Sequence, residues 1–126
     1  MIPLPSSRDP RRLGADGETA AACWYESRGY EVVGRNWRVR EGELDLVLRK
    51  DRTLVFCEVK TRTSARFGVP VEAVTVDKAR RVRLLASRFL DSYPGSGWEI
   101  RFDVASVVPF GSVIRSDDVE VFEAVF

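Results

Sequence analysis

The sequence predicts an α/β domain in which a mixed central sheet of about four to five strands is flanked by helices. Helical and strand-like patterns alternate along the 126 residues in the order helix, three strands, helix, and one or two strands. This order is typical of a layered α/β or α+β sandwich. The length suits one domain. A hydrophobic content of 44% beside 31% charged residues indicates a globular chain.

The two predicted helices are marked by small or apolar residues that recur every three or four positions. The first helix is predicted over about residues 15–28, with Gly29 as a left-handed cap. The second is predicted over about residues 76–92, and most of its remaining surface is basic. The stripes consist of Ala20, Cys23, Trp24 and Ser27 in the first helix, and of Ala79, Val82, Ala86, Phe89 and Leu90 in the second.

The other segments follow from turn residues and strand patterns. Residues 1–12 show no periodicity and are expected to form a flexible N-terminal tail, which leaves residues 13–126 as the single domain. "YEVVGRNWRVR" predicts a strand with a bulge at Gly34. "TSARFGVPVEAV" predicts a loop. "WEIRFDVASVVPF" predicts a strand that Asp103 interrupts, and "DVEVFEAVF" predicts a last strand at an edge.

Composition excludes several kinds of active site. The chain has no histidine, which excludes Ser-His-Asp and Cys-His nucleophilic sites and histidine metal ligands. Two cysteines are too few for a four-ligand zinc site, and Cys23 and Cys57 are both expected to be reduced core residues. Any metal would therefore be held by carboxylate and backbone oxygens, which favours Mg²⁺ or Mn²⁺.

No long apolar run or signal peptide is present, so we expect a cytoplasmic protein without a membrane segment.

The stretch "GELDLVLRKDRTLVFCEVK" reads as a hairpin that carries charges inside its strands. A turn centred between Asp51 and Arg52 would place Asp45 opposite Glu58. The same register would place Glu43 opposite Lys60, on the same face, which a bulge in the turn would disrupt. The other face would be wholly apolar and belong to the core; it comprises Leu44, Leu46, Leu48, Val55, Cys57 and Val59.

Two carboxylates that face each other destabilise a hairpin unless something offsets their charge. A shared proton, a cation or full solvation would each do so. In one interpretation the charged face is a solvated end of the sheet, with Glu43 and Lys60 as a weak ion pair. In the other, Asp45 and Glu58 bind a divalent cation together with the backbone carbonyl of Val59. Such a cation stabilises charge on a phosphodiester and acidifies water, and Lys60 nearby would neutralise developing charge.

Asp45 followed by Glu58-Val59-Lys60 resembles the catalytic pattern of the PD-(D/E)xK nuclease superfamily. The segments "GADGETAA", "GYEVVGRNWRVREGELDLV", "LVFCEVKTR", "FGVP" and "RFDV", with Lys78 in the second helix, follow in order. Together they resemble the YraN-like family of small bacterial proteins over about residues 14–126. That family has a restriction-endonuclease-like fold and is similar to archaeal Holliday junction resolvases.

The resemblance implies a Mg²⁺- or Mn²⁺-dependent endonuclease that acts on nucleic acid, with structured or branched DNA as the expected substrate. It implies metal ligation by Asp45 and Glu58, with Glu18 completing the site and Lys60 as the catalytic lysine. The resemblance also suggests a homodimer. The net charge of +1 is low for tight duplex binding, so either the basic surface is local, or a dimer assembles it, or a protein partner holds the nucleic acid. The residues expected to support the site or contact nucleic acid are Glu43, Arg62, Lys78, Arg80 and Arg81.

Two other functions remain open at this point. One is a non-catalytic module that binds nucleic acid or protein through the basic helix around Arg80. The other is an interaction domain that pairs through its last strand, "VEVFEAVF".

Overall fold

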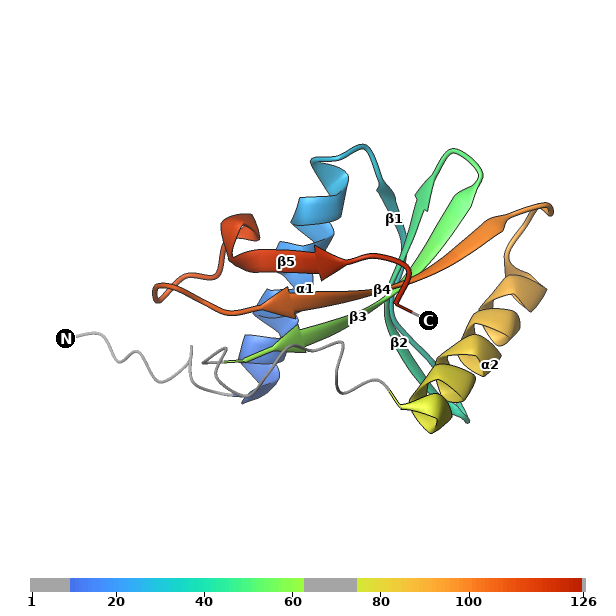
Figure 1. Ribbon diagram of the computed structural model, residues 1–126, viewed down its shortest axis with the longest axis horizontal. Helices are drawn as coiled ribbons and strands as arrows, with labels where there is room; N and C mark the ends of the chain where they lie inside the picture. The colour runs from blue at the N-terminus through green and yellow to red at the C-terminus, as the bar shows by residue number, and fades with distance from the viewer. Residues whose placement is uncertain (1–9, 63–74, 126) are drawn as a thin grey trace.

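The computed structural model describes residues 10–62 and 75–125 of the chain. Within these ranges the predicted order of helices and strands is confirmed (Figure 1). No helix in them is both long and apolar enough to cross a bilayer. The elements are α1 (Pro10–Glu26), β1 (Glu31–Val39), β2 (Gly42–Lys50), β3 (Thr53–Thr61), α2 (Val76–Ser92), β4 (Glu99–Val107), the short 3₁₀ helix η4 (Ser116–Asp118) and β5 (Val119–Phe122).

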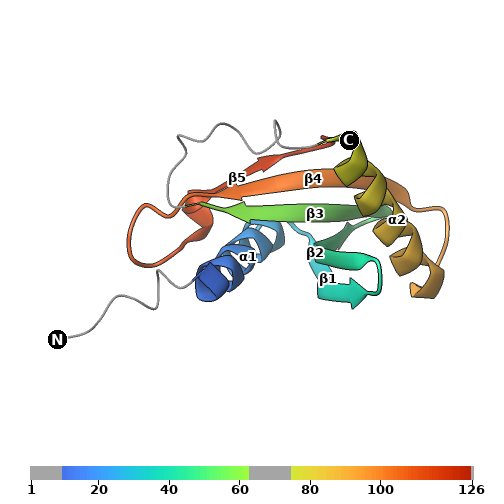
Figure 2. The same cartoon turned by 90° about the horizontal axis from the view of Figure 1, so that it is seen from below.

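The five strands form one mixed sheet in the order β1-β2-β3-β4-β5. Neighbours pair antiparallel except β3 and β4, which run parallel and are connected through α2. A parallel pair needs a crossover of this kind. Figure 2 shows α1 and α2 toward opposite ends of the long strands β3 and β4. The α/β class and the mixed, helix-flanked sheet are therefore confirmed.

Each face of the sheet carries its own core. Tyr25 and the alanines of α1 pack on Leu46, Val55 and Cys57 on one face. On the other face, Leu85, Ala86 and Phe89 of α2 pack against Leu44, Val47, Leu54, Phe56 and Phe102 of the sheet. The predicted apolar face of the hairpin is thus wrong at one position, because Leu44 lies in the core under α2. Strands buried on both faces explain why the hairpin is apolar on both sides.

The N-terminal helix differs from its prediction in extent and in orientation. It begins at Pro10, so residues 10–12 of the expected tail are helical. Its buried side chains are Ala20, Ala21, Ala22 and Tyr25, whereas Cys23 and Ser27 of the predicted stripe are exposed. Cys57 is buried as expected; the core assignment of Cys23 is wrong, and both thiols are free.

A close approach between α1 and β3 sets the position of this helix. A Cβ atom built on Gly17 would lie 1.9 Å from Oγ1 of Thr61 and 3.0 Å from its Cβ. Only a residue without a side chain fits there. Glu18, the next residue, is thereby held beside the end of β3.

Asp103, the predicted interruption of β4, is completely buried and fully bonded. Tyr25 donates its hydroxyl hydrogen to Oδ2 of Asp103 at 2.6 Å. Arg101 donates to both carboxylate oxygens at 2.9 and 2.8 Å, and the backbone N–H of Ala124 donates to Oδ1 at 3.1 Å. The carboxylate therefore ties α1, β4 and the segment after β5 together.

Strand β1 has its predicted irregularity, since the register with β2 shifts between Val32 and Gly34. Gly29 has φ +89°, which confirms a left-handed cap after α1. The predicted range of α2 matches the observed one, and β5 lies at an edge as expected. The whole loop predicted over "TSARFGVPVEAV" lies outside the described residues.

Two glycines of α1 should respond oppositely to alanine. Gly14→Ala should stabilise the protein by about 0.5–1 kcal/mol, because a Cβ there meets nothing within 4 Å and alanine is the better helix former. Gly17→Ala should destabilise it by about 1 kcal/mol or more, because Thr61 on β3 would have to shift. Urea denaturation of both variants measures this. Equal effects at the two positions would contradict the close packing of α1 on β3.

Candidate functional site

The β2–β3 ladder opens at Asp45. Pairing follows the predicted register from Lys50–Thr53 to Leu46–Cys57. Beyond that point Asp45 turns its carboxylate to the neighbouring strand, and Oδ2 accepts a hydrogen bond from the backbone N–H of Val59 at 2.9 Å. The side chain thus replaces a ladder bond. The predicted pairing of Asp45 with Glu58 and of Glu43 with Lys60 is therefore not part of the ladder.

Three carboxylates meet where the strands separate. Glu18 from α1 and Glu43 and Asp45 from β2 each place a carboxylate oxygen within 4.8 Å of the others. Burial raises the pKa of Asp45 to about 6; the Val59 N–H works against this, and the charges of Glu18 and Glu58 add to it. Burial also raises the pKa of Glu18, although a hydrogen bond from Asn36 and the charge of Arg35 oppose the rise. Such a group of half-buried carboxylates could hold a divalent cation.

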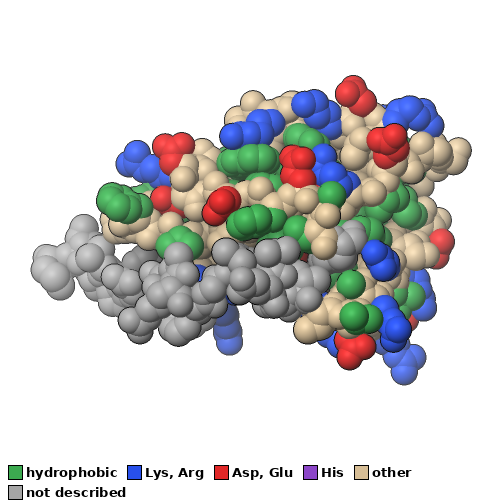
Figure 3. All heavy atoms as spheres, viewed as in Figure 1, with side chains coloured by type: hydrophobic (Ala, Val, Ile, Leu, Met, Phe, Trp, Pro, Cys, Tyr) green, Lys and Arg blue, Asp and Glu red, His purple; other side chains and the backbone are tan. Residues whose placement is uncertain are grey.

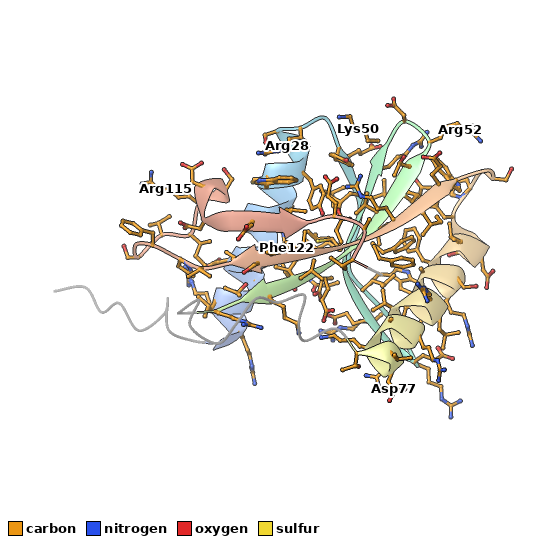
Figure 4. The ribbon with its side chains drawn as sticks, in the orientation of Figure 1. Arg28, Lys50, Arg52, Asp77, Arg115 and Phe122 are labelled. Carbon is orange, nitrogen blue, oxygen red and sulfur yellow. The ribbon has the colours of Figure 1, made fainter. Side chains whose placement is uncertain are left out.

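Two lysine side chains lie against the carboxylate of Glu58 on β3. Oε1 of Glu58 lies 3.2 Å from Nζ of Lys60 and 2.8 Å from Nζ of Lys78. Thr75 caps α2 by accepting a hydrogen bond from the Lys78 backbone N–H at 3.1 Å, which fixes the start of the helix that carries this lysine. Asp77, labelled in Figure 4, marks the end of α2 from which Lys78 reaches β3.

The environment of Lys60 favours its charged form. Burial alone would lower its pKa, but the hydrogen bond to Glu58 and the charges of Glu58 and Asp45 outweigh burial and raise it. The ammonium group therefore stays protonated at neutral pH, suited to neutralising negative charge and unsuited to acting as a base.

One oxygen of the site lacks a partner. Oε2 of Glu58 is buried and has no hydrogen-bond partner among the described residues. A buried, unsatisfied carboxylate oxygen is costly, and a bound cation would remove that cost. The residues present thus fit a hard divalent ion in the donor atoms they offer. The binding of the cation by the backbone carbonyl of Val59 stays a prediction.

The partner of Glu43 is not the one that the sequence predicted. It forms its ion pair with Arg38, which lies directly opposite on β1. Lys60 instead pairs with Glu58 on its own strand. Glu43 therefore belongs with Glu18 and Asp45 by position, and its expected role as a partner of Lys60 is wrong.

Asn36 supports the site and was not found from the sequence. It lies in β1 between the paired positions Arg35–Leu46 and Trp37–Leu44, which places it across from Asp45. Its φ is +51°, a left-handed conformation that asparagine tolerates better than most residues. Its side chain hydrogen-bonds Glu18. No periodic pattern marks such a residue; asparagine inside a strand-like run is the only signal.

The predicted basic contacts lie at different places. Arg80 and Arg81 are exposed on α2, and Arg81 lines a pocket beside the carboxylates. Arg62 follows β3 and donates its backbone N–H to Val107 at 2.9 Å. A second group of basic side chains lies at the opposite end of β2 and β3. Figure 3 shows Lys and Arg side chains along the top of the molecule. Figure 4 labels Arg28, Lys50 and Arg52 in this region.

Comparisons with known proteins identify relatives over most of the chain. The model of the uncharacterised protein family UPF0102 matches residues 17–107. A UPF0102 protein of Beutenbergia cavernae is 53% identical over 96 residues, which cover 76% of this chain and 81% of the relative. One of Nocardia farcinica is 50% identical over 100 residues, 79% of each chain. One of Leifsonia xyli is 43% identical over 96 residues, covering 76% and 81%.

The backbone at Asn36 makes a prediction that stability measurements can check. Asn36→Gly should keep the left-handed conformation without strain, whereas Asn36→Ala should be less stable than the glycine variant by about 1 kcal/mol. Both variants lose the hydrogen bond to Glu18, so their difference isolates the backbone. Chemical denaturation measures it, and an alanine variant at least as stable as the glycine variant would refute the conformation.

Proposed function

The chain belongs to the uncharacterised protein family UPF0102, the YraN-like family that its motifs resemble, and we propose that it is a metal-dependent endonuclease that hydrolyses phosphodiester bonds in nucleic acid. The family description names no activity, so the proposal rests on the site. The observation that carries it is the meeting of four carboxylates and two lysines where the β2–β3 ladder opens.

The carboxylates would hold the cation. Asp45 is fixed by its hydrogen bond from the Val59 N–H, so one of its oxygens is oriented by the backbone. Glu58 contributes the buried, unpartnered Oε2. Glu18 and Glu43 lie within reach of the same ion as Asp45. A bound Mg²⁺ or Mn²⁺ supplies Lewis-acid stabilisation of the phosphoryl oxygens and an acidified water.

The lysines would act on the substrate. The Nζ atoms of Lys60 and Lys78 both lie beside Glu58. A phosphodiester at the carboxylates would bring its own negative charge into this position. Both ammonium groups could then donate to phosphoryl oxygens, where charge accumulates as the bond breaks. Two lysines from different elements, β3 and α2, would also fix the orientation of the phosphate.

Basic side chains near the site support nucleic acid as the substrate. Arg81 lies on α2 next to Lys78 and lines the same pocket, and Arg80 is exposed beside it. Contacts of this type to phosphates position a nucleic acid without reading its sequence. The net charge of +1 favours local binding, or a dimer or partner that supplies further basic surface, over binding along an extended duplex.

Cleavage assays test the proposal. Single-stranded, duplex, flap and four-way DNA and RNA would be incubated with Mg²⁺ or Mn²⁺. At least one form should be cut. Asp45→Asn and Lys60→Met should each reduce the rate by about 100-fold or more, because each removes charge stabilisation from the reaction.

Glu31→Gln is the matched control, since it removes a carboxylate that is exposed at the start of β1. It should cut like the unaltered protein. Cleavage that persists in Asp45→Asn, or the absence of cleavage on every substrate, would contradict the proposal. Binding without cleavage in all cases would favour the non-catalytic module.

A further inference from the structure

A pocket of about 200 Å³ lies between the open ends of β2 and β3 and the first half of α2. Its floor is apolar: Leu44, Phe56 and Leu85 contribute and are 4%, 1% and 2% exposed. Val82 of α2 forms part of its wall and is only half-buried. The floor residues belong to the core under α2, so they hold the pocket in shape without an occupant.

The walls of this α2 pocket carry opposite charges. Glu43, Asp45 and Glu58 line one side, and Lys78 and Arg81 line another. An apolar floor with a few polar groups at the rim is the usual composition of a small-molecule site. The volume is below the roughly 300–1,000 Å³ of pockets for drug-sized ligands, so it suits a single ring system.

We propose that the α2 pocket receives the base of one unpaired nucleotide next to the phosphate at the carboxylates. This inference rests on the proposed function, because the carboxylates and lysines fix where the phosphate lies. A base joined through its sugar to that phosphate reaches only the immediate surroundings. The α2 pocket adjoins the same carboxylates, and it offers a flat ring an apolar floor and its polar edge a charged rim.

The geometry selects among nucleic acids. A paired and stacked base cannot enter a pocket without leaving its helix, which costs a few kcal/mol, and an already unpaired base avoids most of that cost. Single strands and the unpaired positions of flaps or junctions are therefore the preferred substrates. Little sequence preference is expected, since an apolar floor accepts any base.

Binding of two probes tests the inference on the unaltered protein. The first is a fluorescein-labelled oligothymidylate, and the second is an oligomer of equal length with the same phosphates and abasic sugars. Fluorescence anisotropy in Ca²⁺ would report both affinities. The oligothymidylate should bind about tenfold or more tightly, because a base placed on an apolar surface adds to binding. Equal affinities would overturn the inference.

Two phenylalanine variants on α2 provide a matched pair. Val82→Phe should fill the α2 pocket and abolish the preference for the oligothymidylate. Leu84→Phe adds the same ring at a position that is 44% exposed on the same helix and does not line the pocket, and it should keep the preference. A folded Val82→Phe protein that retains the full preference would also overturn the inference.

The outcomes separate this inference from the proposed function. Cleavage in Mg²⁺ or Mn²⁺ without any preference for bases would leave the endonuclease standing and remove the base site. A preference for bases without cleavage would support the base site and contradict the endonuclease. Mn²⁺ binding to Val82→Phe, measured by calorimetry, should match that of the unaltered protein and shows that the carboxylates are undisturbed.

Discussion

The hydrogen bond from the Val59 backbone N–H to Asp45 is the interaction on which the site depends. A carboxylate that takes the place of a ladder acceptor lets β2 and β3 part after Leu46 and Cys57 while the N–H of Val59 keeps a hydrogen-bond acceptor. The opening gives room to Glu43, Asp45 and Glu58, which also line the α2 pocket that forms there. Without it, the hairpin would continue as an ordinary strand pair buried on both faces.

Helices on both faces of the sheet complete the opening. Helix α1 approaches β3 closely enough that only glycine fits at position 17, and this brings Glu18 to the carboxylates. Helix α2 begins at its Thr75 cap and points Lys78 at Glu58 from the other face. The buried Asp103 accepts hydrogen bonds from Tyr25, Arg101 and Ala124 and so holds α1 against β4. The candidate site is thus built on helices and strands, which position side chains more precisely than loops do.

Much of this arrangement could be predicted because it follows from side-chain periodicity. The limits of α2, the hairpin register as far as Leu46–Cys57 and the irregularity near Gly34 all come from local patterns. The stripe of α1 failed because the alanines of "TAAACWYE" fit several helical phases equally well. The opening at Asp45, the left-handed Asn36 and the partners of Asp103 involve bonds between side chain and backbone or between distant segments. Such bonds produce no repeating residue pattern, so they cannot be predicted from the sequence.

Crystallography of Mn²⁺-soaked crystals, read by anomalous scattering, would show whether Asp45 and its neighbouring carboxylates bind a divalent ion. A metal site there should give a strong peak at the strand opening, about 2–2.5 Å from a carboxylate oxygen of Asp45, as expected for an oxygen-ligated divalent ion. A fully soaked crystal with no peak at Asp45, or with Mn²⁺ bound only elsewhere on the molecule, would contradict it.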